Sequence, residues 1–87
     1  MEAVETRVAV IAIIVREGTQ VMALNDLLHQ YGPYIVGRMG VPYREKGVNI
    51  ISVAMDAPGD VISALSGKLG RLEGVIAKTV YAPAGSV

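Results

Sequence analysis

The fold is decided by residues 37–51, which read GRMGVPYREKGVNII from Gly37 to Ile51. This stretch joins two runs rich in β-branched residues, Tyr34–Val41 and Val48–Met55. Pro42, three charged residues and Gly47 interrupt the apolar pattern between the runs. Two apolar runs around a short polar loop bounded by Pro and Gly are typical of a β-hairpin. We therefore predict an antiparallel strand pair at the middle of the chain.

Before the hairpin, the sequence predicts one strand and one helix. Thr6–Val15 is apolar at both odd and even positions, which is typical of a central strand covered on both faces. Helix periodicity follows from Gln20 to about Gln30 or Tyr31, with Thr19 as the predicted N-cap. The predicted apolar stripe of this helix consists of Val21, Leu24, Leu27, Leu28 and Tyr31. Gly32-Pro33 is expected to stop the helix.

After the hairpin, the order is reversed. A turn at residues 56–60 precedes a predicted helix at about Val61–Leu69, capped by Gly59 or Asp60. Its predicted stripe consists of Val61, Ile62, Leu65, Leu69 and Leu72. Gly67 costs this helix about 1 kcal/mol relative to Ala, so we expect it to mark a close approach to a neighbour. Val75–Tyr81 is the last predicted strand.

The resulting βαββαβ order predicts an α+β, ferredoxin-like domain. Short connections and right-handed crossovers favour an antiparallel sheet in the order 4-1-3-2, with both helices on one face. Residues 1–87 form one domain, with its core at about 6–81. The third strand's share of the second sheet face, Ile50, Ser52 and Ala54, would be small and apolar. We expect another copy of the chain to cover it.

Composition excludes several classes of function. The formal net charge is zero, so the chain has no electrostatic footprint for nucleic acid or an anionic membrane. There is no cysteine and only one histidine, His29, so we expect no metal site and no cofactor. The longest apolar run, Val8–Val15, is too short to span a bilayer and lacks the flanks of a signal peptide. We expect a cytoplasmic protein.

Two short motifs suggest nucleotide or nucleic-acid binding but lack the necessary context. Ser66-Gly67-Lys68 matches only the end of a P-loop, because Ile62 and Leu69 occupy positions that need Gly and Ser or Thr. Gly37-Arg38-Met39-Gly40 matches the GxxG of a KH domain, yet it lies within a strand-like run. A β-bulge or a close backbone contact explains it better.

The residues best suited to bind a ligand lie in the hairpin and at the first helix. Arg38 and Arg44 flank Pro42 and could pair with a carboxylate or a phosphate, although most surface arginines are simply solvated. The loop Glu17-Gly18-Thr19 precedes the first helix, where free N–H groups suit a small anion.

Enzyme chemistry finds little support in the sequence. No Ser/His/Asp set is evident, and the carboxylates are scattered over loops and termini. Acylphosphatase uses the same fold with an arginine in a phosphate-binding loop, which Arg16-Glu17-Gly18 echoes only faintly. A small hydrolase of that type is the weakest alternative.

Several segments together resemble one small family. They are Asp26–His29, Arg38–Glu45, Ile50-Ile51, Ala64–Gly70, Gly74-Val75 and Lys78–Val80. The chain resembles the proposed regulators of the iron-only hydrogenase system of anaerobic bacteria, from about Thr6 to Tyr81. The resemblance implies an ACT-like fold, similar to the C-terminal domain of NikR repressors, and an oligomeric regulatory role. The histidines and cysteine of the NikR nickel site are missing here, so nickel sensing is not implied. ACT domains hold an amino acid near the first strand–helix loop, where this chain has Glu17-Gly18-Thr19.

We therefore expect a non-enzymatic regulatory module that forms a homo-oligomer, either a dimer or a tetramer. It would bind a small ligand or a protein partner, such as a protein of the hydrogenase system, at a subunit interface. The residues expected at that interface are Glu17, Gly18, Thr19, Gln20, Arg38, Gly40, Pro42, Arg44, Ser66, Gly67 and Lys68. The alternative is a scaffold for hydrogenase maturation that binds no small ligand.

Overall fold

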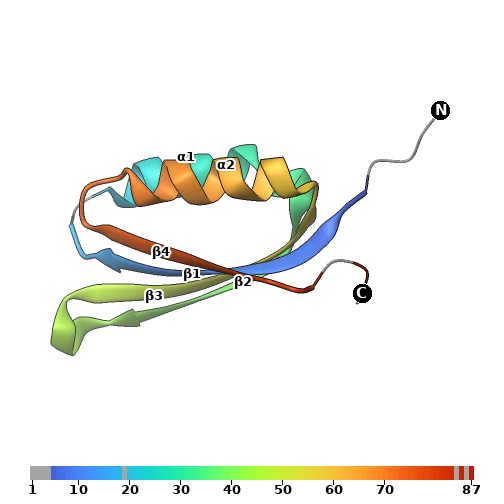
Figure 1. Cartoon of the computed structure of the whole chain (residues 1–87). Coiled ribbons are helices and arrows are strands. Elements are labelled where there is room, and N and C mark those ends of the chain that lie inside the picture. The colour runs from blue at the N-terminus through green and yellow to red at the C-terminus, as the bar shows by residue number, and fades with distance from the viewer. Residues whose placement is uncertain (1–4, 19, 84, 86) are drawn as a thin grey trace.

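A computed structural model describes residues 5–18, 20–83, 85 and 87 of the chain. The elements follow the predicted βαββαβ order, with one short 3-10 turn before the second strand and another after it (Figure 1). In chain order they are β1 (Arg7–Arg16), α1 (Val21–Gln30), a 3-10 turn (Gly32–Tyr34), β2 (Ile35–Tyr43), a second 3-10 turn (Arg44–Lys46), β3 (Val48–Ala57), α2 (Gly59–Gly70) and β4 (Val75–Tyr81).

The four strands form one antiparallel sheet in the order β2-β3-β1-β4. Read from the other edge, this is the predicted order 4-1-3-2, which is confirmed. Both helices lie on the same face of the sheet, and no helix or strand of the described residues covers the opposite face (Figure 1). The chain is thus a two-layer α+β domain with β1 and β3 in the centre and β2 and β4 at the edges.

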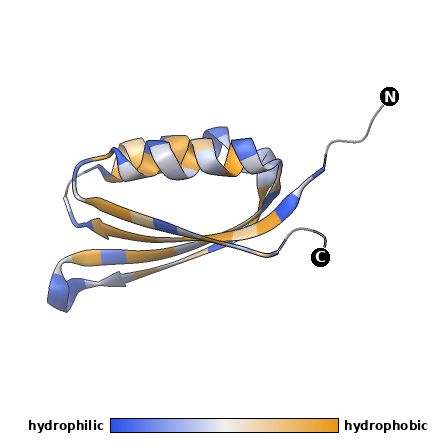
Figure 2. Cartoon of the chain, in the orientation of Figure 1, coloured by the Kyte–Doolittle hydropathy of each residue, from blue (hydrophilic) through white to orange (hydrophobic). Residues whose placement is uncertain are grey.

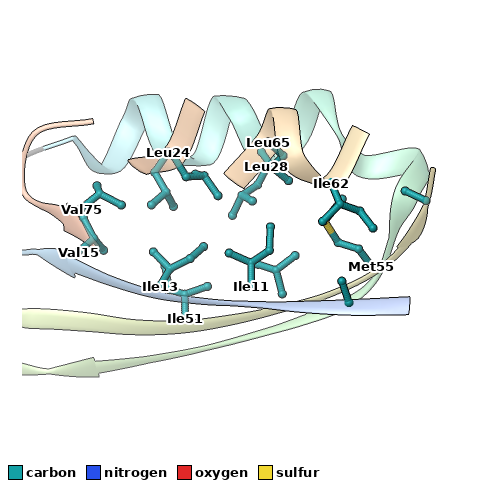
Figure 3. Packing of buried hydrophobic residues seen from close by; sticks show 14 residues of the cluster. Ile11, Ile13, Val15, Leu24, Leu28, Ile51, Met55, Ile62, Leu65 and Val75 are labelled. Atoms are coloured by element: carbon teal, nitrogen blue, oxygen red, sulfur yellow. The ribbon is translucent and has the colours of Figure 1, made fainter. Parts of the chain in front are cut away.

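The core lies between the helices and the sheet (Figure 3). Along β1, alternate residues are buried, and Ile11, Ile13 and Val15 are at most 1% exposed. They belong to one cluster with Leu24 and Leu28 of α1, Ile51, Val53 and Met55 of β3, and Ile62, Leu65 and Leu69 of α2. Burying each large side chain of this kind contributes about 1.5–3 kcal/mol. The predicted stripes of both helices are therefore confirmed as the surfaces that form the core.

The helix starts differ from the predicted ones. Gln20 is the N-cap of α1 and makes no side-chain capping bond, while Thr19 lies outside the described residues. Pro58 is the N-cap of α2, so the prediction of Gly59 or Asp60 was wrong. The carbonyl of Pro58 accepts hydrogen bonds from the N–H groups of Val61 and Ile62. The backbone of Pro58 is extended, with ψ at 145°, and the helix begins after it with no capping bond from a polar side chain.

The strand β2 is longer than predicted, and its place at the edge of the sheet explains why. β2 continues through Pro42 to Tyr43, so the prediction that the strand ends at Val41 was wrong. Proline lacks an N–H donor, and an edge strand tolerates this loss on its unpaired side. The pairing with β3 shifts between Ile35 and Gly37. This shift at the start of the Gly37–Gly40 segment agrees with a bulge, which is one of the two explanations that the sequence suggested for it.

The turn of the hairpin depends on Gly47. Its φ is +65°, in the left-handed region, and an added Cβ would meet no atom within 4 Å. We expect Gly47→Ala to lower the free energy of unfolding by about 1–2 kcal/mol, because an L-residue is strained at this φ. The comparison is Gly32→Ala, since Gly32 has equal space and no positive φ. Urea unfolding of both variants checks this, and an equal effect at the two sites would contradict it.

Candidate functional site

The sheet face opposite the helices is apolar and open to solvent. Register pairing aligns Val41, Ile50, Ile14 and Ile76 in one row across all four strands. These four side chains are 43–58% exposed. Other large apolar side chains exposed on the four strands are Val8, Val10, Val36, Met39, Tyr43 and Val80. Figure 2 shows the hydrophobic residues extending along the strands. The predicted apolar character of the second face is confirmed, and we call it the open face.

Both signs of charge occur on the open face. Lys78 of β4 lies in the row of Ala12, next to the row of isoleucines. Asp56 of β3 pairs with Val8, nearer the start of β1. Lys78 and Asp56 are both exposed. Arg16 at the end of β1 pairs with Val48 and belongs to the same face, so the open face combines an apolar surface with charges of both signs at separate places.

The helix-facing side of the sheet contains a cavity at its β2 edge. The cavity has a volume of about 230 Å³ and lies between the first turns of α1 and the β2–β3 pair. Its lining residues are Val15, Val21, Leu24, Asn25, Arg38, Gly40, Val41, Pro42, Asn49 and Ile51. Most of them are apolar, and Asn25, Arg38 and Asn49 supply the polar groups.

Gly40 explains why the cavity is present. It pairs with Ile51, whose side chain is in the core, so position 40 faces the helices. A Cβ added at Gly40 would meet only Ile51 Cγ1, at 3.8 Å, which is an ordinary contact. A side chain at this position would thus extend into the cavity.

Arg38 places a positive charge at the cavity. Its Nη2 donates a hydrogen bond to Asn25 Oδ1 at 3.2 Å, which links β2 to α1. Arg38 makes no ion pair with the carboxylates of residues 5–18, 20–83, 85 and 87. Since Asn25 Oδ1 is an acceptor here, the amide NH₂ of Asn25 is available as a donor. The arrangement suits an oxygen-bearing anion next to an apolar wall.

The structure brings only some of the predicted site residues to this cavity. Arg38, Gly40 and Pro42 line it, and Gln20 immediately precedes α1, whose first turns form one wall. Glu17 and Gly18 follow β1, and the backbone N–H of Glu17 donates to Gly47 O at 2.8 Å. Neither they nor Arg44, which lies in the second 3-10 turn, line the cavity.

The predicted site residues of α2 lie apart from the cavity and have partners within the chain. Ser66 Oγ accepts a hydrogen bond of 2.8 Å from Thr79 Oγ1 of β4. Lys68 Nζ donates to the hydroxyl of Tyr31 at 2.9 Å. A Cβ at Gly67 would meet the Arg71 guanidinium at 3.7 Å, and no closer atom. The predicted close approach at Gly67 is therefore wrong among the described residues.

Sequence reasoning missed Asn25 and Asn49. Asn49 has the same strand parity as Ile51, Val53 and Met55, which face the core. A polar residue at a core-facing position was the signal that could have identified this side of the cavity. Asn25 follows Leu24 of the apolar stripe, and nothing in its spacing distinguishes it from a solvated helix residue.

Sequence reasoning also did not identify the contacts of Arg7. Its Nη2 donates to the carbonyl of Ala82 at 3.0 Å, and its guanidinium carbon lies 4.6 Å from the centroid of the Tyr81 ring. Arg7 thus ties the start of β1 to the end of β4. Arg7 therefore has a structural role, because it holds the first and last strands together at this edge of the core.

In the described parts of the chain, no three His, Cys, Asp or Glu side chains gather in a way that could hold a metal ion. In the same residues, neither helix is both long and apolar enough to cross a membrane.

Comparison with known proteins places the chain in a family. The protein TM1266 from Thermotoga maritima is a solved structure with 38% sequence identity and a TM-score of 0.86. That match covers 88% of this chain and 98% of TM1266. A formyltetrahydrofolate deformylase from Pseudomonas putida shares only the fold, with 15% identity and a TM-score of 0.62 over 87% of this chain and 29% of its own. A search of curated proteins finds no match.

The profile of one protein family matches residues 7–79, nearly all of the folded part. Its description is "Iron-only hydrogenase system regulator, putative". The match confirms the resemblance found in the sequence. The chain belongs to the TM1266-like family of the iron-only hydrogenase system.

Proposed function

We propose that this chain is a non-enzymatic, ACT-like regulatory module of the iron-only hydrogenase system that works in the cytoplasm as a homo-oligomer. In this proposal it binds a small ligand or a protein partner near a subunit interface. Family membership supports the hydrogenase system as its setting. The open face is the observation that carries the oligomeric part of the proposal.

A second copy of the chain is the occupant that best fits the open face. An apolar surface of this breadth is unusual on a monomer, because burying it is favourable. In a two-fold dimer each residue pair occurs twice, so Lys78 of each copy can pair with Asp56 of the other. The apolar surface is what supports this occupant, with Lys78 and Asp56 as the charges that a two-fold arrangement would have to pair.

A scaffold for hydrogenase maturation is the second candidate, and the edge strand β2 favours it. Val36, Met39 and Val41 of β2 are 50–74% exposed. An apolar edge strand can accept an added strand from another protein. In this version the chain would hold a maturation protein and would need no small ligand.

Deletion of the gene in its host separates the two functions. A regulator is expected to change hydrogenase transcript or the activity of matured enzyme, and the wild-type chain should restore both. A scaffold is expected to leave the transcript unchanged while hydrogenase protein accumulates without activity. If hydrogenase transcript, protein and activity all stay the same, neither function holds.

A further inference from the structure

We propose that the cavity between α1 and β2 binds a small organic carboxylate with a branched apolar body. This inference rests on the proposed function and identifies the chemical class of its ligand. The argument uses the walls of the cavity, its polar groups and its charge balance.

The walls select an apolar body of limited size. Val21 of α1 and Val41 and Pro42 of β2 provide accessible aliphatic surface. Val15, Leu24 and Ile51, which also line the cavity, are at most 8% exposed. The volume of about 230 Å³ is below the usual range of about 300–1,000 Å³ for sites of drug-sized ligands. Because the walls are aliphatic and the described lining contains no aromatic ring, a short branched hydrocarbon fits better than a planar ring system.

The polar groups select a carboxylate. The Arg38 guanidinium is a planar fork that can donate two parallel hydrogen bonds to a carboxylate. Asn25 already accepts a bond from Arg38 through Oδ1, so its NH₂ group can donate to the same anion. Asn49, which is half-buried at the cavity, offers a further amide.

The charge balance favours a monoanion over a phosphate. Arg38 is the one cationic side chain in the described lining, and the lining contains no Asp or Glu. One guanidinium matches the single charge of a carboxylate, whereas the lining offers no second cation for a dianionic phosphate.

Binding at this site would also affect the open face, because β2 contributes to both. Successive residues of β2 point to opposite sides of the sheet. Arg38 and Gly40 lie on the helix-facing side, while Met39 and Val41 lie in rows of the open face, and Val41 also lines the cavity at the sheet edge. A ligand that fixes β2 against α1 therefore acts on the same strand that contributes to the proposed subunit interface.

The test is an NMR titration of the full-length, ¹⁵N-labelled chain with 3-methylbutanoate and 4-methylpentanoate at millimolar concentrations. We expect saturable shifts of the Val21, Gly40 and Ile51 amides. The neutral amide 3-methylbutanamide should bind at least about tenfold more weakly, because it lacks the charge that pairs with Arg38. Inorganic phosphate should give no saturable shift at these amides.

Three variants make the test specific. Arg38→Gln should weaken carboxylate binding about tenfold or more, and Gly40→Leu should abolish it by filling the cavity. Arg44→Gln removes the same charge outside the cavity and should leave binding unchanged. The spectrum of each variant shows whether it is folded.

The inference is overturned if neither carboxylate gives a saturable shift, or if the neutral amide or phosphate binds as well. Unchanged binding by folded Arg38→Gln also overturns it. In each of these cases the oligomeric state and the deletion phenotype still test the proposed function independently.

Discussion

Ile14→Lys is expected to convert the oligomer into a monomer. Ile14 lies on the central strand β1, in the apolar row with Val41, Ile50 and Ile76, and is 43% exposed in the single chain. In the proposed interface, each copy would bury one unpaired ammonium, at a cost of about 3–5 kcal/mol. A loss of this size weakens association by more than about a hundredfold. Sedimentation velocity at micromolar concentration would then show a single species of monomer mass.

Met22→Lys is the matched control for this experiment. It makes the same type of change on α1, where Met22 is 81% exposed and lies away from the open face. This variant should keep the mass of the unmodified chain. An Ile14→Lys protein that is folded and still oligomeric would show that the subunits meet elsewhere.

Leu65→Ala is expected to lower the free energy of unfolding by about 2–5 kcal/mol. Leu65 is completely buried between α2 and the sheet. Alanine is the best helix former, so the substitution keeps the helix and removes only packing. Because a domain of this size has only about 4–13 kcal/mol of stability, the loss is a large part of the total. Urea unfolding followed by circular dichroism measures it.

The comparison for Leu65→Ala is Met22→Ala, at an exposed position on the other helix. Its free energy of unfolding should stay within about 0.5 kcal/mol of the unmodified value. Similar effects at the two positions would mean that α2 does not pack on the sheet in the way described.

The layout of the fold could be predicted because apolar residues occupy regular odd or even positions along the strands. Between its terminal arginines, β1 is apolar at every position from Val8 to Val15, and the structure buries one parity under the helices while the other forms the open face. A sheet order that puts β1 in the centre follows from this pattern and from the short connections. The helix stripes were equally clear, since residues at spacings of three and four form one face.

The helix starts were less predictable because backbone and side-chain caps compete. Asp60 is a good capping residue by type, and its Oδ1 does accept a bond from the N–H of Val61 at 3.0 Å. The N-cap is nevertheless Pro58, whose extended backbone places its carbonyl for the first helical bonds. The sequence contains both signals and does not rank them.

The cavity could be predicted only in part. The motif around Arg38, Gly40 and Pro42 was identified as a binding segment, and these three residues do lie together. Its partner wall was not found, because Asn25 and Asn49 come from two other elements and meet Arg38 only through the tertiary fold. For Gly67 the sequence showed an unusual residue but not its surroundings, which hold the Arg71 guanidinium.

The measurement that tests the central claim most directly is native mass spectrometry of the unmodified chain across a range of concentrations. The account predicts a dimer or tetramer that persists at low micromolar concentration, because the open face is covered by another copy. A chain that remains a monomer throughout would contradict it, and would leave the apolar face without the partner on which the proposed function depends.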